Sequence, residues 1–158
     1  MTGPFHFVTV EHADRSAVVD AMQVMKSAFD PVFGEAWNAA QLSSLLTMPG
    51  SWLTLIYAGN AVVGFALMRA ILDEAELLLI AVQPQWRGRS AGSQLLEHAL
   101  ERARGRGVRS VHLEVRRGNA AANIYQRAGF YHANTRPRYY HGADGSRHDA
   151  LSFRLELD

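Results

Sequence analysis

Residues 76–93 read ELLLIAVQPQWRGRSAGS, and this segment is the most informative one for the fold. Its first part, residues 76–82, is an almost unbroken apolar run, which predicts a buried strand. Its last part is rich in small and cationic residues, and apolar residues at helical spacing follow from Leu95 onward. The stretch therefore predicts a strand, a tight turn and the start of a helix.

The turn after this strand predicts a site for phosphate groups. The first N–H groups of a helix have no partner within it, and they lie at the positive end of the helix dipole. Small side chains let a ligand approach this backbone closely. Each such contact contributes only about 0.3–1 kcal/mol when exposed, so several must act together. We call the residues that can supply them the cradle: Gly88, Arg89, Ser90, Ala91, Gly92 and Ser93. A dinucleotide-binding turn is the competing interpretation, but its G-x-G-x-x-G spacing is absent here.

The cradle lies in the most basic part of the chain. The net charge is +1 overall, but residues 84–138 contain eleven arginines against three acidic residues. This excess would match an anionic partner, either nucleic acid or a phosphorylated cofactor, although a solvated basic face is a third interpretation. Aromatic side chains for base stacking are not interleaved with these arginines, so we expect a cofactor and no nucleic acid.

The composition predicts a single domain over residues 1–158. The absence of cysteine excludes disulfides, thiolate metal sites and covalent cysteine intermediates, so a transferase would move its group directly. No uncharged apolar run reaches about eighteen residues, and the opening MTGPFHFVTV lacks the features of a signal peptide. We expect a cytoplasmic protein without a membrane partner, and the composition leaves its oligomeric state open.

Strand and helix patterns extend over the rest of the chain. Asn38 and Gln41 match a capping box that would start a helix, which would end before Pro49. The predicted strands are residues 5–10, 52–57, 61–71, 76–82, 109–115, 130–133 and 151–157, and the other predicted helices are residues 17–29, the segment from the cradle to Gly105 or Gly107, and residues 119–128. A polar loop is expected over residues 134–149, with Asp144-Gly145 as a turn.

These elements predict an α/β fold with a mixed sheet of about seven strands. The N-terminal strands would form an antiparallel meander. A central parallel crossover would run through the cradle, with helices on both faces of the sheet.

The strand at residues 109–115 places a carboxylate on its polar face. The period of two puts Val111 and Leu113 on one face and His112 and Glu114 on the other. Glu114 therefore points away from its apolar neighbours, and His112 shares its face.

The order of these motifs resembles the GNAT superfamily of N-acetyltransferases. Within it, the sequence is most similar to the ribosomal-protein-alanine N-acetyltransferase group. The matching segments are LLLIAV, the cradle, LLEHALERARGRGV, HLEVRRGNAAANIYQRAGF and RPRYYHGADGSRHDAL, with a weaker match at Glu35-Ala36-Trp37. The resemblance implies a transferase that uses acetyl-CoA and no metal ion.

The resemblance also implies which residues bind this cofactor. The strand backbone at Ile80, Ala81 and Val82 would face the pantetheine arm and the thioester. The cradle would bind the pyrophosphate, and the side chains of Arg87 and Arg89 would add positive charge. Asn119 matches a cofactor-contacting asparagine, but it lies one residue closer to Tyr125 than the family pattern has it. In the alternative alignment Gly118 takes that place and Asn119 is a helix N-cap.

Two residues match the family's catalytic positions. Glu114 would act as the general base, and Tyr125 would protonate the departing thiolate. His112, on the same face as Glu114, is the second candidate for the base. The alternatives are a Glu114 that merely pairs with Arg116 or Arg109, and a Tyr125 that is a packed core residue.

The acceptor implied by the resemblance is the N-terminal amine of a protein or peptide, with a ribosomal protein as the first candidate. An α-amine has a pKa of about 8, whereas deprotonating a lysine with a pKa of about 10.4 costs roughly 4 kcal/mol near neutral pH. We find one base candidate with no second carboxylate beside it, which is compatible with the easier acceptor. Tyr139 and Tyr140, expected in the polar loop, are candidates for contacting the acceptor.

A small-molecule amine (a polyamine or an aminoglycoside) is the alternative acceptor, and a non-catalytic acyl-CoA-binding module is the alternative class. The remaining histidines lack metal-ligand spacing.

Overall fold

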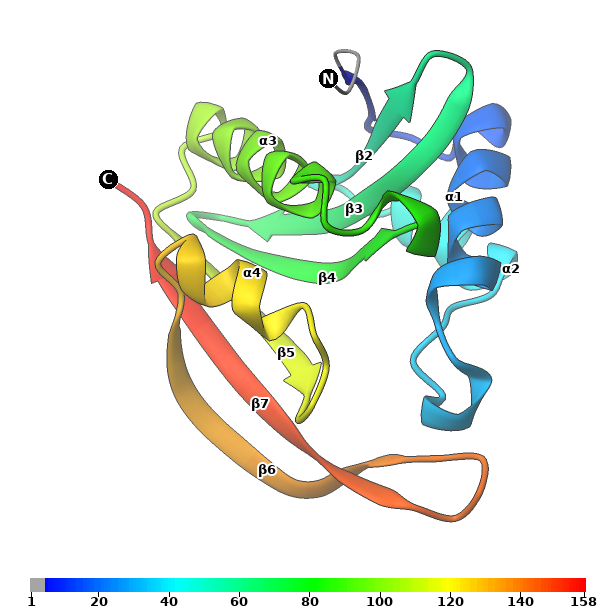
Figure 1. The fold of residues 1–158 in the computed structure, drawn as a ribbon. Helices are drawn as coiled ribbons and strands as arrows, with labels where there is room; N and C mark the ends of the chain where they lie inside the picture. The colour runs from blue at the N-terminus through cyan, green and yellow to red at the C-terminus, as the bar shows by residue number, and fades with distance from the viewer. Residues whose placement is uncertain (1–4) are drawn as a thin grey trace.

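The computed structural model describes residues 5–158, which form a mixed seven-stranded sheet flanked by helices (Figure 1). The strand order is β1-β2-β3-β4-β5-β7-β6, and only the β4–β5 pair is parallel. The elements are β1 (His6–Val10), α1 (Arg15–Ala28), η1 (Pro31–Phe33), α2 (Ala39–Leu46), β2 (Ser51–Ala58), β3 (Ala61–Ile71), β4 (Glu74–Val82), η2 (Pro84–Trp86), α3 (Ala91–Gly105), β5 (Ser110–Arg116), α4 (Ala122–Arg127), β6 (Tyr131–His141) and β7 (Arg147–Glu156). The predicted fold class, element order and parallel crossover are confirmed.

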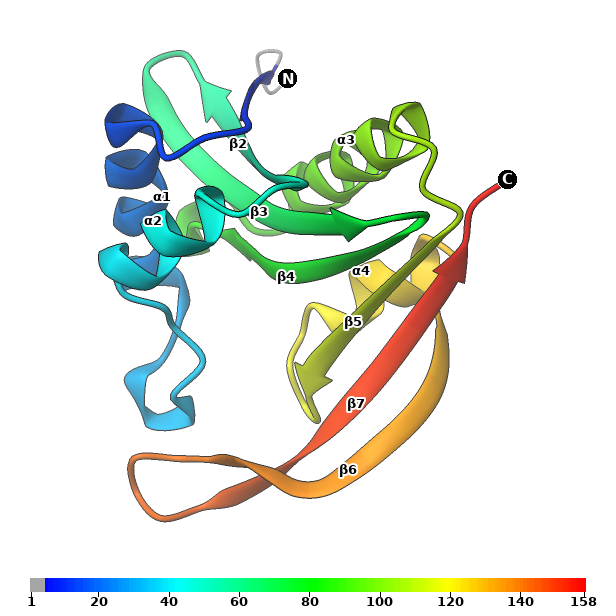
Figure 2. The same cartoon turned by 180° about the vertical axis from the view of Figure 1, so that it is seen from behind.

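Helices cover both faces of the sheet, as predicted (Figures 1 and 2). The first hydrophobic core packs α3 and α4 on one face, and the second packs α1 and α2 on the other. Side chains along β2 point to the two faces of the sheet in turn. Trp52 and Ile56 belong to the first core, and Leu53 and Leu55 belong to the second. The central strands are therefore buried on both faces.

Side-chain caps fix the starts of the helices on the second face. The Asp14 carboxylate accepts a hydrogen bond from the N–H of Ala17 at 2.9 Å, at the start of α1. Asn38 and Gln41 form the predicted capping box at α2, with both hydrogen bonds at 2.8 Å. These bonds satisfy N–H groups that the helices leave unpaired.

Strand β4 is bent away from β5 by a β-bulge. The pairing register with β3 shifts between Leu67 and Met68, where β4 contains Leu78 as an extra residue. A bulge bends its strand and increases the local twist. Strands β4 and β5 pair only where residues 74–76 meet residues 110–112. Beyond that point they diverge (Figures 1 and 2), and their facing edges have no ladder partner among residues 5–158.

The predicted polar loop over residues 134–149 is wrong, because β6 and β7 extend through it as a long hairpin. A bulge between Arg136 and Tyr140 accommodates Pro137, which has no N–H to donate to a ladder. The hairpin turns near Asp144, close to the predicted position. Strand β6 is the edge of the sheet and is exposed along almost its whole length, so its sequence lacks the apolar alternation of a strand.

Candidate active site

The backbone N–H groups of the cradle have no acceptor within residues 5–158. The first paired amide is that of Gln94, which donates to the carbonyl of Ser90 at 3.0 Å. The turn is shaped by two left-handed residues, Gly88 with φ 77° and Ser90 with φ 61°. A row of unpaired amides at the N-terminus of a fifteen-residue helix is a binding site for an anion.

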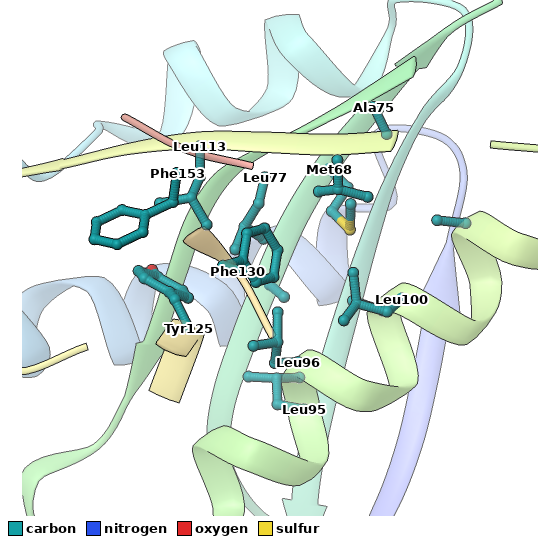
Figure 3. Packing of buried hydrophobic residues seen from close by; sticks show 14 of the residues in the cluster. Met68, Ala75, Leu77, Leu95, Leu96, Leu100, Leu113, Tyr125, Phe130 and Phe153 are labelled. Atoms are coloured by element: carbon teal, nitrogen blue, oxygen red, sulfur yellow. The ribbon is translucent and has the colours of Figure 1, made fainter. Parts of the chain in front are cut away.

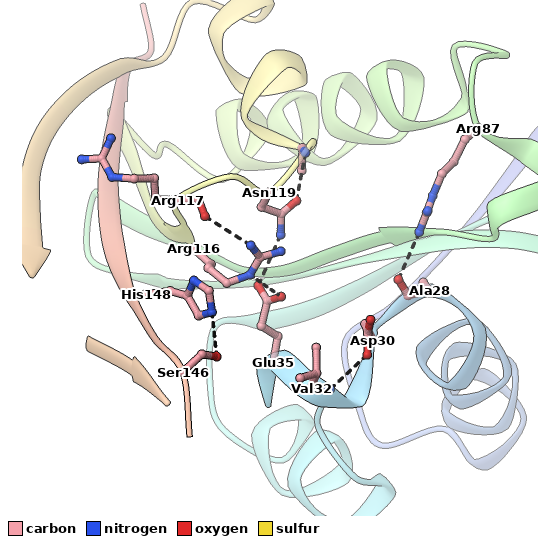
Figure 4. A network of polar contacts seen from close by, with 11 residues as sticks. Ala28, Asp30, Val32, Glu35, Arg87, Arg116, Arg117, Asn119, Ser146 and His148 are labelled. Atoms are coloured by element: carbon pink, nitrogen blue, oxygen red, sulfur yellow. Dashed lines mark hydrogen bonds and ion pairs between the residues drawn. The ribbon is translucent and has the colours of Figure 1, made fainter. Parts of the chain in front are cut away.

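Two arginines lie beside the cradle. Arg87 donates from Nη2 to the carbonyl oxygen of Ala28, at the end of α1, at 3.0 Å (Figure 4). The guanidinium of Arg89 lies 5.2 Å from the ring centre of Trp86. Both side chains belong to exposed residues and keep further N–H donors for an anionic ligand.

The predicted cofactor strand forms the wall of the gap between β4 and β5. Ile80, Ala81 and Val82 pair with β3 on one side, and the edge facing β5 is unpaired beyond residue 76. Such an edge can accept an extended ligand as though it were another strand. The cradle follows this edge directly in the chain, so the two candidate binding elements are adjacent.

Glu114 lies on β5, and its side chain is 25% exposed. Its partner is neither of the two predicted arginines, because Nε of Arg136 lies 3.0 Å from Oε2 of Glu114. The predicted pairing with Arg116 or Arg109 is therefore wrong. The Oγ of Ser152, directly opposite on β7, donates to the same Oε2 at 3.4 Å. Within residues 5–158 the other oxygen, Oε1, has no hydrogen-bond partner.

Tyr125 is 5% exposed and belongs to the first hydrophobic core (Figure 3). Its ring centre lies 5.9 Å from that of Phe130 and 6.4 Å from that of Phe153. Its hydroxyl has no hydrogen-bond partner in the described part of the chain. Burial raises the pKa of Tyr125, and the charges of Glu35 and Tyr140 raise it further. The residue is thus a packed tyrosine that keeps its proton at neutral pH, as a proton donor must.

A second carboxylate, Glu35, lies close enough to influence both candidate tyrosines. Burial raises the pKa of Tyr140 to about 12, and the charges of Glu114 and Glu35 contribute to the shift. Glu35 also raises the pKa of Tyr125. Glu35 is therefore a second carboxylate within electrostatic range of Tyr140, in addition to Glu114. The only signal in the sequence was the weak family match at Glu35-Ala36-Trp37.

Tyr139 and Tyr140 lie on β6 and not in a loop. Tyr139 is 48% exposed, and the guanidinium of Arg136 lies 4.8 Å from its ring centre. Tyr140 is half-buried, and its ring meets that of Tyr139 edge to face at 5.4 Å. Because Arg136 also contacts Glu114, the structure brings both tyrosines to the side of the predicted base.

Asn119 holds the turn before α4. Its Oδ1 accepts from the N–H of Ala121 at 2.9 Å, and its Nδ2 donates to Oε2 of Glu35 at 3.3 Å (Figure 4). The helix itself begins at Ala122, three residues later than the predicted start at residue 119. Asn119 therefore closes an Asx turn ahead of α4, whose N-cap is Ala121 without a side-chain bond. One hydrogen of its Nδ2 is left for another acceptor.

The other candidates of the sequence fall outside this arrangement. Nε2 of His112, the second base candidate, lies 3.9 Å from a carboxylate oxygen of Glu76. Residues 5–158 contain no group of acidic, histidine or cysteine side chains arranged to bind a metal ion. Within the same residues, no helix combines the length and apolar character needed to cross a bilayer.

Strands β4 and β5 leave an unpaired gap at the middle of the sheet, next to a helix start with unpaired amides, and this arrangement has the shape and donors to hold an extended phosphorylated ligand. Residues 19–130 match the model of the acetyltransferase (GNAT) family. This chain belongs to that family, and the resemblance noted in the sequence is confirmed.

Two relatives are named ribosomal protein bS18-alanine N-acetyltransferase. The chain is 43% identical over 94 residues to the one from Escherichia coli K12, and the alignment covers 59% of this chain and 63% of that relative. It is 34% identical over 142 residues to the one from Haemophilus ducreyi, covering 85% of this chain and 97% of the relative. The crystal structure of the Escherichia coli enzyme superposes with a TM-score of 0.86 at 28% identity, covering 98% of this chain and 95% of that one.

Proposed function

We propose that this protein is an acetyl-CoA-dependent N-acetyltransferase that modifies the N-terminal α-amine of a protein, such as a ribosomal protein. The observation that carries the proposal is the row of unpaired cradle amides beside the gap between β4 and β5. The names of the relatives from Escherichia coli and Haemophilus ducreyi support the acceptor. We also propose the cytoplasm as its compartment, since ribosomal proteins are made there.

The cofactor would be bound mainly by backbone groups. In this proposal the strand edge at Ile80, Ala81 and Val82 holds the pantetheine arm, and the cradle amides donate to the pyrophosphate. Arg87 and Arg89 neutralise part of its charge. Asn119 offers the remaining hydrogen of its Nδ2. Acetyl-CoA supplies an activated acyl group when it is bound.

Two side chains would move the protons of the reaction. Oε1 of Glu114 accepts a proton from the acceptor's ammonium, directly or through a water molecule, so that the neutral nitrogen can attack the thioester carbonyl. A carbon–nitrogen bond forms and the carbon–sulfur bond breaks. The Tyr125 hydroxyl donates its proton to the departing sulfur. The nitrogen releases its second proton to solvent as the amide forms, and a proton from solvent restores the Tyr125 hydroxyl. A tyrosine hydroxyl is protonated at neutral pH, so it has a proton to donate.

The acceptor would approach along β6. Tyr139 and Tyr140 are the proposed contacts, because they lie beside Arg136 and so beside the proposed base. Oε1 of Glu114 lies opposite the oxygen that Arg136 contacts, and it can accept a hydrogen bond from an N-terminal ammonium. It can accept from a polyamine as well, so a small-molecule amine remains the second candidate.

Incubation with acetyl-CoA and a library of N-terminal peptides, followed by mass spectrometry, tests the proposal. The expected product carries one acetyl group on the α-amine. Glu114→Gln and Tyr125→Phe should each lower the rate without abolishing acetyl-CoA binding. Acetylation of polyamines alone would identify the second candidate, and tight cofactor binding without transfer to any amine would identify a non-catalytic binding module.

A further inference from the structure

A buried ion pair joins the connection between α1 and α2 to the end of β5. Nε of Arg116 lies 3.1 Å from Oε1 of Glu35, and both side chains are only 12% exposed. The guanidinium of Arg116 also lies 3.6 Å from the ring centre of Phe33. A buried ion pair is costly to break, because removing one partner leaves an uncompensated charge. This contact therefore fixes the position of the connection.

The same carboxylate reaches the helix that carries Tyr125. Oε2 of Glu35 accepts from Nδ2 of Asn119 at 3.3 Å, and Oδ1 of Asn119 accepts from the N–H of Ala121 (Figure 4). One side chain thus holds two elements, with Oε1 on β5 and Oε2 on the turn that starts α4. Arg116 and Asn119 lie 81 and 84 residues from Glu35 in the sequence.

The connection also contacts the β6–β7 hairpin. The carbonyl of Val32 accepts from the N–H of Ala143 at 2.7 Å, near the hairpin turn. The ring of Phe33 meets that of His148 edge to face at 5.3 Å. Gly142 permits this approach, since a Cβ there would lie 2.7 Å from the carbonyl oxygen of Val32. Residues 32–35 therefore contact both the end of β5 and the β6–β7 hairpin, which lie on two sides of the proposed acceptor site.

We infer that Glu35 is a positioning residue for acetyl transfer. Through Arg116 and Asn119 it fixes the acceptor side of the site relative to Tyr125 on α4. The inference rests on the proposed function, because it assigns Glu35 to the same reaction. Its role follows from geometry: a reacting group displaced by about 1 Å can lose about 100-fold in rate, although the group itself is intact.

The test compares Glu35→Gln with wild type in steady-state kinetics, using acetyl-CoA and an N-terminal peptide. The neutral side chain has the same shape but loses the ion pair, and we expect kcat to fall about 10- to 100-fold. The KM for acetyl-CoA should be unchanged, since the cradle is not involved. Glu11→Gln is the matched control, because Glu11 also pairs with an arginine, Arg102 at 3.0 Å, but outside the site. This control should have wild-type kinetics.

Asn119→Ser provides a second, independent test. Serine can still accept from the N–H of Ala121 in a turn of the same kind, so the variant should fold even if Glu35→Gln does not. It loses the bond to Glu35, so kcat should fall. The KM for acetyl-CoA is compared in Glu35→Gln, because Asn119 is itself a proposed cofactor contact. The kcat of the double variant should be no lower than that of the more impaired single variant, because both changes interrupt the contacts that run from Arg116 through Glu35 to Asn119.

The outcomes separate the inference from the proposed function. An active wild type together with wild-type kinetics for both Glu35→Gln and Asn119→Ser would overturn the inference alone. A rise in the KM for acetyl-CoA at constant kcat in Glu35→Gln would also overturn it, because that result assigns Glu35 to cofactor binding. A wild type that acetylates no amine would overturn the proposed function, and the inference with it.

Discussion

Gly92 and Ile124 hold the first turn of α3 against α4 at a separation that leaves no room for a side chain. A Cβ on Gly92 would lie 2.8 Å from Cδ1 of Ile124. Gly92→Ala would therefore force the end of the Ile124 side chain to move, at a cost near the lower end of the about 1–3 kcal/mol typical of overpacking. We predict weaker binding of acetyl-CoA by roughly tenfold, measured by titration calorimetry.

Gly105→Ala is the control for this substitution, because it lies at the other end of α3 and a Cβ there meets nothing within 4 Å. Alanine in a helix is more stable than glycine by roughly 0.5–1 kcal/mol. We expect a higher melting temperature and unchanged affinity for acetyl-CoA. Equal affinity losses in both variants would contradict the steric explanation.

Ser90 adopts the left-handed conformation, with φ 61°, that glycine adopts without strain. Ser90→Gly should relieve about 1 kcal/mol of this strain. It loses only an exposed side-chain bond with Gln94. We predict higher stability in urea unfolding with acetyl-CoA affinity at least as high as that of wild type. A less stable or weaker-binding variant would show that the serine side chain has a role of its own.

Glu114→Gln tests the base. A positioned base typically contributes about 10² to 10⁴ in rate, and we predict a loss of kcat in that range. The amide can still accept from Ser152, and the lost partner, Arg136, is 52% exposed, so stability should change by less than about 1 kcal/mol. The matched variant is His112→Gln, on the same face of β5, which should retain kcat. A selective loss in His112→Gln would instead identify His112 as the base.

The raised pKa values of three tyrosines predict a loss of stability at alkaline pH. Burial is the main cause at Tyr57, Tyr125 and Tyr140, and a hydrogen bond to Asp20 adds to it at Tyr57. The unfolded chain loses these protons near pH 10, whereas the folded protein retains them, with Tyr140 titrating at about 12. The unfolded state then binds fewer protons, so stability falls as the pH rises above about 10 and is intact below it.

Urea unfolding at a series of alkaline pH values checks this prediction. Tyr57→Phe removes one of the three groups at a position outside the proposed site, so it should flatten the decline. A pH dependence identical to that of wild type would contradict the assignment to Tyr57.

The sequence was sufficient for the parts of the fold that depend on local periodicity. The apolar run before the cradle, the capping box at Asn38 and the polar face of β5 each arise from neighbouring residues, and the structure contains all three. The order of elements then left few ways to arrange the sheet.

The remaining features depend on contacts between distant segments. The bond between Arg136 and Glu114 joins β6 to β5, and β6 is an exposed edge strand without an apolar pattern. Glu35 lies in a connection whose position is set by Arg116, 81 residues away. The periodicity of a sequence carries no information about contacts between distant segments. The position of Glu35 and the pairing of Glu114 with Arg136 could therefore not be predicted.

Hydrogen exchange can show whether the cradle amides bind the pyrophosphate of acetyl-CoA. None of the N–H groups of residues 88–93 has an acceptor within residues 5–158, so they should exchange rapidly in the free protein. If they bind the pyrophosphate, acetyl-CoA will slow their exchange, and the amide of Arg106 at the far end of α3 will be unaffected. Saturation with acetyl-CoA that leaves exchange at residues 88–93 unchanged would contradict the account.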